Sequence, residues 1–159
     1  MKRETPLSFL YLAVCVAIFL AGCATPLATP EQDAQARLLH PAPDKAVIYL
    51  LRDQGDLYVT EVNVGLDGKV VGTTWPNTFY RWEVPAGPHI LVSFTEPPAV
   101  LTLETEPGGV YYVWQDINIG RLREPSRLQT VDAITARYTL DSADLLENKA
   151  EMPGKPPAN

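Results

Sequence analysis

Residues 62–94 read VNVGLDGKVVGTTWPNTFYRWEVPAGPHILVSF, and this stretch decides the fold class. Val62, Val64 and Leu66 alternate with polar residues or glycine, which is the period of a strand with one buried face. Asp67-Gly68 follows this run. An Asp-Gly pair between two strand-like runs is typical of a tight β-hairpin, because both turn positions need positive φ. The stretch therefore predicts consecutive antiparallel strands joined by short turns.

Two proline-containing breaks divide the rest of this stretch into further strands. Pro76-Asn77 and residues 85–88, which read PAGP, interrupt the alternation, because proline cannot donate a ladder hydrogen bond. Gly87 is expected to permit a tight corner, and a ring nitrogen of His89 is expected to bond a nearby backbone group. Gly72 predicts a bulge or close packing against an aromatic ring.

Similar segments flank this stretch on both sides. Residues 46–51 read AVIYLL, which suits a central strand covered on both faces, and residues 100–105 and 110–119 add two more strands. The alternation places each of three sets of residues on one face of its strand, and the third set is expected to face inward. The sets are Tyr80, Trp82 and Val84; Ile90, Val92 and Phe94; and Leu101 and Leu103. Breaks every 8 to 12 residues or so are typical of sandwiches and barrels. We predict an all-β fold, an antiparallel β-sandwich of about seven strands.

The pattern is less regular after residue 120. Residues 127–131 fit an edge strand. In residues 133–140 the apolar positions fit both helical spacing and strand alternation, so both interpretations stay open. Asp141-Ser142 before residues 143–149 predicts a short, capped C-terminal helix.

The first 22 residues have the form of a signal peptide. Two basic residues, Lys2 and Arg3, precede a run from Pro6 to Gly22 without charge. A permanent transmembrane anchor is the alternative, because this run is near the shortest that can span a bilayer. Residues 20–23, LAGC, resemble the lipobox of bacterial lipoproteins. That resemblance implies cleavage between Gly22 and Cys23 and lipidation of the Cys23 thiol, with palmitate as the expected acyl chain.

The lipoprotein resemblance also implies a location. Two or more acyl chains hold a protein firmly at a membrane. Ala24 rather than aspartate follows the lipidated residue, which favours the outer membrane, facing the periplasm, if the source is Gram-negative. Inner-membrane retention stays the alternative.

Four regions follow from these features. They are the signal peptide at 1–22, a lipidated N-terminus and Pro/Ala-rich tether at 23–44, the β-sandwich domain at 45–148, and a disordered tail at 149–159. Within the tether, residues 31–39 are expected to form a short helix, with Thr29 as its N-cap and Pro30 as its first residue.

Composition excludes several functional classes. The formal net charge of −6 speaks against a nucleic-acid partner. Of the two cysteines, Cys15 lies in the signal peptide and Cys23 would carry lipid, so no disulfide is expected. With two histidines and no glycine-rich phosphate loop, we predict no metal, no cofactor, no catalytic residue and no enzyme.

Four segments together resemble a known family of bacterial lipoproteins. They are AVIYLLR at 46–52, VGLDGKVVG at 64–72, NTFYRWEVPAGPHIL at 77–91 and PGGVYYV at 107–113. Their order is similar to that in the domain-of-unknown-function 2846 family, and also to small carrier-like β-sandwiches. That family has no established activity, so the resemblance implies a fold and a location but no chemistry.

Aromatic side chains supply the remaining candidate site. Tyr111 and Tyr112 must point to opposite faces of their strand, so one of them faces outward. One interpretation is a core built from large side chains. The other is a platform for a glycan or an extended peptide, formed by Trp82, Tyr111, Tyr112 and Trp114. An enzyme centred on His89 ranks last, because Ser93 would lie about 13 Å away along the same strand.

The sequence as a whole predicts a membrane-anchored, periplasm-facing lipoprotein without catalytic activity. Its role would be interaction with an envelope protein or envelope maintenance. The alternative function is a glycan- or peptidoglycan-binding module that uses exposed aromatic side chains. The predicted partners are the membrane, through the lipid anchor, and an envelope protein or peptidoglycan, with no nucleic acid.

Overall fold

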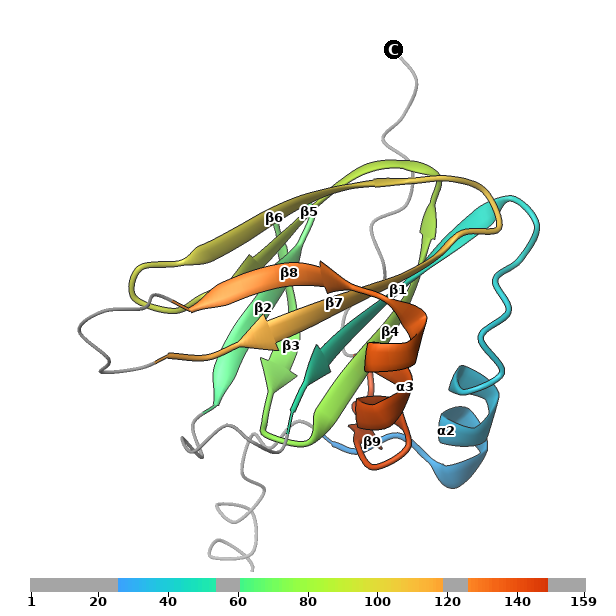
Figure 1. The fold of residues 1–159 in the computed structure, drawn as a ribbon, viewed down its shortest axis with the longest axis horizontal. Helices are drawn as coiled ribbons and strands as arrows, with labels where there is room; N and C mark the ends of the chain where they lie inside the picture. Colours follow the sequence, from blue (N-terminus) through green and yellow to red (C-terminus); the bar gives the residue numbers. More distant parts are fainter. Residues whose placement is uncertain (1–25, 54–60, 119–125, 149–159) are drawn as a thin grey trace, which may run out of the picture.

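Two β-sheets packed face to face make up the body of the protein, with two short helices on one side (Figure 1). The computed structural model describes residues 26–53, 61–118 and 126–148. The predicted signal peptide, lipidation site and C-terminal tail lie outside these residues. The described part confirms the predicted all-β sandwich.

The first sheet has the strand order β8-β7-β1-β4-β9. Its strands are β1 (Lys45–Arg52), β4 (Thr78–Pro85), β7 (Val110–Asp116), β8 (Arg127–Val131) and β9 (Asp144–Leu145). Every residue of β1 after Lys45 is buried, which confirms the prediction of a central strand covered on both faces. The sheet is mixed, since β1 runs parallel to β7 and β4 parallel to β9. These partners are far apart in sequence, so no hairpin imposes an antiparallel direction on them.

The second sheet has the strand order β3-β2-β5-β6 and is antiparallel throughout. Its strands are β2 (Val62–Leu66), β3 (Lys69–Thr74), β5 (Gly87–Ser93) and β6 (Ala99–Thr105). Asp67 and Gly68 have φ values of 50° and 79° between β2 and β3, which confirms the predicted hairpin. Gly87 has a φ of 133°, as a corner that favours glycine requires.

Strand β5 presents two polar residues, His89 and Ser93, to the interior on either side of Leu91. His89, Leu91 and Ser93 are buried, and Ile90, Val92 and Phe94 share the opposite face as the alternation predicts. The inward polar groups have interior partners, because His89 contacts Asp67 and Ser93 accepts from Gln115. These hydrogen bonds make the burial of polar side chains tolerable.

The outward residues of β5 belong to an apolar row across the second sheet. In the register of the sheet, Val70 lies opposite Gly65, Gly65 opposite Val92, and Val92 opposite Val100. Val70 and Val100 are more than half exposed, as is Phe94. This row on the outer face of the second sheet is therefore apolar and open to solvent.

The outer face of the first sheet is covered by helices. These are α2 (Pro30–Ala36) and α3 (Ala133–Leu140), and they pack over Val47, Tyr49, Leu51, Phe79 and Tyr112. Thr29 caps α2 in a reciprocal pair with Gln32, which confirms the predicted cap, although the helix ends earlier than predicted. Asp132 caps α3, so the segment with two open interpretations is a helix.

The helix predicted at residues 143–149 is wrong for its described part. Asp144 and Leu145 form β9, and Leu146 forms a β-bridge with Leu27. Successive residues of a strand point to opposite faces. Leu145 therefore packs beneath the helices while Leu146 enters the core between the sheets.

The prediction of an extended tether up to residue 44 is also wrong for its described part. The backbone N–H of Ala28 donates to Leu145 at 2.9 Å, and that of Glu147 donates to Pro26 at 3.0 Å. Ala36, at the end of α2, is buried. The segment docks because the apolar outer face of β1 and β4 needs a cover. The folded unit thus includes residues 26–44.

Candidate functional site: a groove beside helix α3

The four aromatic residues predicted as a platform do not share one surface. Trp82 is fully buried between the sheets and stacks on Tyr80, with ring centroids 5.3 Å apart. Tyr111 also packs against the core between the sheets, and its hydroxyl accepts from the backbone N–H of Glu106 at 2.8 Å. A buried indole cannot stack against a ligand, so the platform is wrong as a set of four.

The other two members lie on the outer face of the first sheet. Tyr112 packs in the cluster beneath the helices and stacks on Tyr49 with centroids 5.4 Å apart. Trp114 is two residues further along β7, so it is on the same face, and it is half-buried. Tyr112 and Trp114 are therefore the platform residues that remain on a side where a ligand could approach.

His89 is held by two acceptors on opposite sides of its ring. Its Nδ1 lies 2.7 Å from Oδ2 of Asp67, and its Nε2 lies 2.8 Å from the carbonyl oxygen of Pro85. The contact with Pro85 confirms the predicted backbone partner. Ser93 is occupied elsewhere, because its Oγ accepts from Nε2 of Gln115 at 2.8 Å. In this arrangement His89 ties the β2–β3 turn to the corner between β4 and β5.

A groove with a volume of about 480 Å³ lies beside α3. It is bounded by α3, by Tyr112 of β7 and by Leu39 from the segment after α2. Ile134 and Tyr138, one helical turn apart, line it and are 87% and 80% exposed. Sites for small molecules usually have volumes of roughly 300–1,000 Å³. This groove, which we call the α3 groove, is therefore the candidate site.

Tyr112, which is largely buried, lines the α3 groove. The residue is 9% exposed, and within the described residues its hydroxyl makes no hydrogen bond. Burial raises the pKa of Tyr112, and the nearby positive charge of Arg137 opposes this rise. The hydroxyl stays protonated near neutral pH, so it can donate a hydrogen bond to a bound group.

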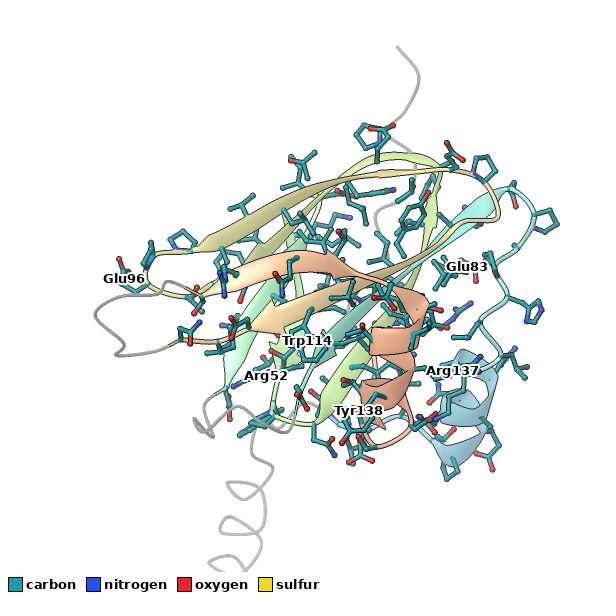
Figure 2. All side chains as sticks on the ribbon, in the orientation of Figure 1. Arg52, Glu83, Glu96, Trp114, Arg137 and Tyr138 are labelled. Atoms are coloured by element: carbon teal, nitrogen blue, oxygen red, sulfur yellow. The ribbon has the colours of Figure 1, made fainter. Side chains whose placement is uncertain are left out.

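Arg137 contributes a positive charge without a protein partner in the described part of the chain. The side chain lines the groove and is exposed, and no carboxylate or carbonyl oxygen there is within bonding distance. Figure 2 shows Arg137 on the side of α3 that faces α2. Asp141, one turn later on α3, adds a carboxylate to the same groove.

Arg37 is the opposite case, because its guanidinium is already engaged. It contacts Asp33 at 2.7 Å and donates to the carbonyl oxygens of Leu140 and Ala143. It also lies over the ring of Phe79, 5.2 Å from the centroid. Arg37 therefore holds α2 against the end of α3, whereas the guanidinium of Arg137 makes no such contact with the described residues.

The described residues offer neither a metal centre nor a membrane-spanning helix. They contain no group of three or more His, Cys, Asp or Glu side chains placed to hold a metal ion. No helix in residues 26–53, 61–118 or 126–148 is long and apolar enough to cross a membrane.

Comparison with known proteins gives one relative without an assigned role. No family model matches the chain, and no solved structure matches it. An uncharacterized protein of Haemophilus influenzae is 28% identical over 108 residues, which cover 66% of this chain and 64% of the relative. The chain thus spans just under two thirds of that relative's length. The resemblance to the domain-of-unknown-function 2846 family stays a prediction.

Sequence reasoning missed most of the α3 groove. Ile134 and Tyr138 are four residues apart, which on a helix places two large apolar side chains on one face. That signal was present, but it does not tell which face is buried. In the structure the smaller Ala136 and Thr139 face the sheet instead. The contact of α3 with Leu39 and Tyr112 depends on tertiary packing alone.

Proposed function

We propose that this chain is a lipid-anchored protein of the bacterial cell envelope whose sandwich acts as a binding module rather than as an enzyme. The observation that carries the proposal is the sequence of residues 20–23, LAGC, after an uncharged apolar run. The outer membrane, facing the periplasm, is the proposed location, because Ala24 rather than aspartate follows Cys23.

The docked N-terminal segment sets how far the body would lie from the membrane. Only Ala24 and Thr25 separate Cys23 from Pro26, where the packed segment begins. An extended chain reaches about 10 Å over this interval. A lipid on Cys23 would therefore hold the sandwich at the membrane surface, next to partners in the envelope.

The α3 groove supports binding as the proposed activity. It brings together the free guanidinium of Arg137, the hydroxyl of Tyr112 and the carboxylate of Asp141. None of the described groove residues is a nucleophile hydrogen-bonded to a base, the arrangement that covalent catalysis requires. A glycan- or peptidoglycan-binding module is the second candidate function. The exposed ring of Tyr138 favours it, because sugars stack on aromatic faces.

Metabolic labelling with palmitate tests the anchor. The wild-type chain, expressed in a Gram-negative host, should carry the label and sediment with membranes. Cys23→Ser should lose the label, because it removes the acyl-accepting thiol. Cys15→Ser is the matched control, since it removes the other cysteine from within the apolar run. Continued labelling of Cys23→Ser, or loss of label in Cys15→Ser alone, would contradict the proposed anchor.

A further inference from the structure

The α3 groove contains three polar groups that the fold itself does not use. Among the described residues, Arg137 has no ion pair and the Tyr112 hydroxyl has no hydrogen bond. The carboxylate of Asp141 is likewise exposed and makes no hydrogen bond within the described part. The Tyr112 hydroxyl can therefore donate a hydrogen bond to a ligand in the groove.

The charges of the groove specify the ligand's polar groups. Arg137 and the Tyr112 hydroxyl are donors, so together they suit an anionic acceptor. Asp141 lies one helical turn from Arg137 and repels a second negative charge. The groove thus favours one carboxylate, together with neutral hydroxyl or amide donors that can bond Asp141.

The remaining walls specify the ligand's shape. Tyr138 offers a ring that is 80% exposed, and Ile134 extends this apolar wall by one turn. A sugar has neutral hydroxyl groups around an apolar ring face, and that face can stack on an aromatic side chain such as Tyr138. A volume of about 480 Å³ leaves room for a small saccharide.

An extended peptide fits the groove less well. Peptides that bind to sheets pair with a free strand edge. The strand in this groove is β7, which is already hydrogen-bonded to β1 on one side and to β8 on the other. The groove therefore offers side chains but no open backbone ladder.

We propose that the α3 groove binds a sugar that carries a single carboxylate. Arg137 and Tyr112 hold the carboxylate, Asp141 accepts from a hydroxyl or amide of the sugar, and the ring lies against Tyr138. This inference deepens the proposed binding function and rests on it, but it does not depend on the lipid anchor.

Titration of defined sugars, followed by nuclear magnetic resonance, tests this proposal on the full-length chain in detergent. The probes are N-acetylmuramic acid and glucuronic acid, with neutral N-acetylglucosamine and simple acetate as comparisons. N-acetylmuramic acid differs from N-acetylglucosamine by a lactyl group that bears the carboxylate. We expect both acidic sugars to bind at least tenfold more tightly than N-acetylglucosamine and than acetate. Tighter binding of N-acetylmuramic acid would indicate a cell-wall glycan as the ligand, and tighter binding of glucuronic acid would indicate another acidic polysaccharide.

Three variants assign the binding to the groove. Arg137→Gln should weaken binding of the acidic sugars at least tenfold, and Tyr112→Phe should weaken it severalfold because only the hydroxyl is lost. Arg127→Gln is the matched control, since Arg127 of β8 is also exposed but pairs with Asp116 of β7, outside the groove. Arg137→Lys separates the effect of charge from that of shape. Lysine keeps the positive charge but lacks the planar guanidinium that binds a carboxylate with two hydrogen bonds.

The possible outcomes distinguish this proposal from the general binding function. Equal binding of neutral and acidic sugars would overturn the carboxylate assignment, and equal binding of acetate would overturn the sugar assignment. Equal losses in Arg137→Gln and Arg127→Gln would place the site elsewhere. Absence of binding by every probe would overturn the sugar proposal, while the palmitate labelling would still decide the anchor.

Discussion

Gly72 marks the point where β3 passes closest to the ring of Tyr80. A Cβ atom at this position would lie 2.1 Å from the Tyr80 hydroxyl oxygen. That hydroxyl accepts from the backbone N–H of Thr73 and donates to its carbonyl oxygen, both at 3.1 Å. The register of β2 and β3 also shifts here, between Val64 and Gly65. Both sequence expectations for Gly72, a bulge and an aromatic contact, are confirmed.

Gly72→Ala should therefore destabilise the protein by about 1–3 kcal/mol, because the added methyl group displaces a buried tyrosine. Urea unfolding monitored by tryptophan fluorescence measures the change. Gly65→Ala is the matched control with milder contacts, since its Cβ atom would lie 3.1 Å from the exposed Phe94 ring, which can move, and 3.2 Å from the Lys69 carbonyl oxygen. A larger loss in Gly65→Ala than in Gly72→Ala would contradict this explanation.

His89 illustrates at the same scale why a residue type does not establish a function. As the one histidine of the predicted β-sandwich domain, it is the natural candidate for catalysis. Its two ring nitrogens instead contact Asp67 and the Pro85 carbonyl oxygen, which joins the β2–β3 turn to the corner between β4 and β5. The contact with Pro85 is the backbone bond that the sequence predicts, whereas the contact with Asp67 depends on the tertiary structure.

At the scale of elements, α3 depends on a cap that the sequence contains but the periodicity does not predict. The Asp132 carboxylate accepts from the backbone N–H groups of Ile134 and Thr135 at 2.8 and 3.0 Å. It also accepts from the Thr135 hydroxyl at 2.9 Å. The buried residues of α3, Ala136, Thr139 and Leu140, make a weak apolar pattern, so the cap does much to define where the helix begins.

This cap predicts a pH dependence. The Thr135 backbone N–H, then the Thr135 hydroxyl and the Ile134 N–H, hold the pKa of Asp132 below its usual range in the folded protein. A carboxyl whose pKa falls on folding stabilises the protein fully above about pH 5 and loses that contribution as the pH drops below about 4.

Asp132→Asn isolates this contribution, because asparagine also caps helices but does not titrate. Relative to the wild type, the variant should lose less stability between pH 5 and pH 3. Thermal unfolding across this range measures the difference. Parallel stability profiles for the two proteins would contradict the assigned role of the carboxylate.

At the scale of the whole molecule, the N-terminal segment completes the fold. Residues 26–28 add to the edge of the first sheet beyond β9, and α2 covers Tyr49 and Phe79. Arg37 links this segment to the carbonyl oxygens of Leu140 and Ala143 near the C-terminal end of the domain. Both ends of the domain therefore meet on the same face.

Arg37→Gln should lower the free energy of unfolding by about 2 kcal/mol, because it removes charge-assisted hydrogen bonds to two backbone carbonyls. Arg137→Gln should change it by less than about 0.5 kcal/mol, since Arg137 is exposed and makes no such contact in the described structure. Chemical denaturation compares the two variants. If the residues up to 44 were a free tether, Arg37→Gln would change the free energy of unfolding as little as Arg137→Gln does.

Much of the sandwich was predictable because its turns and strands are specified by residues that are close together in the chain. Turn residues and alternation at Asp67-Gly68, Gly87 and residues 46–51 depend on neighbours in the chain, and each prediction there is confirmed. The errors arise where the information is not local. The aromatic set containing Trp82 is split between two faces. A strand pattern also cannot tell which of its faces meets the core: Ile90 and Phe94 share one face as predicted, and only the structure shows that this face is exposed.

The sequence by itself determined the all-β class, the hairpins and the lipobox-like segment that ends at Cys23, because each depends on residues adjacent in the chain. Only the tertiary structure decided which faces are buried, where residues 26–44 dock, and that Leu39, Tyr112 and Arg137 share one groove. The physical reason is that burial is set by the apolar surfaces that pack together. Those surfaces come from segments far apart in the sequence.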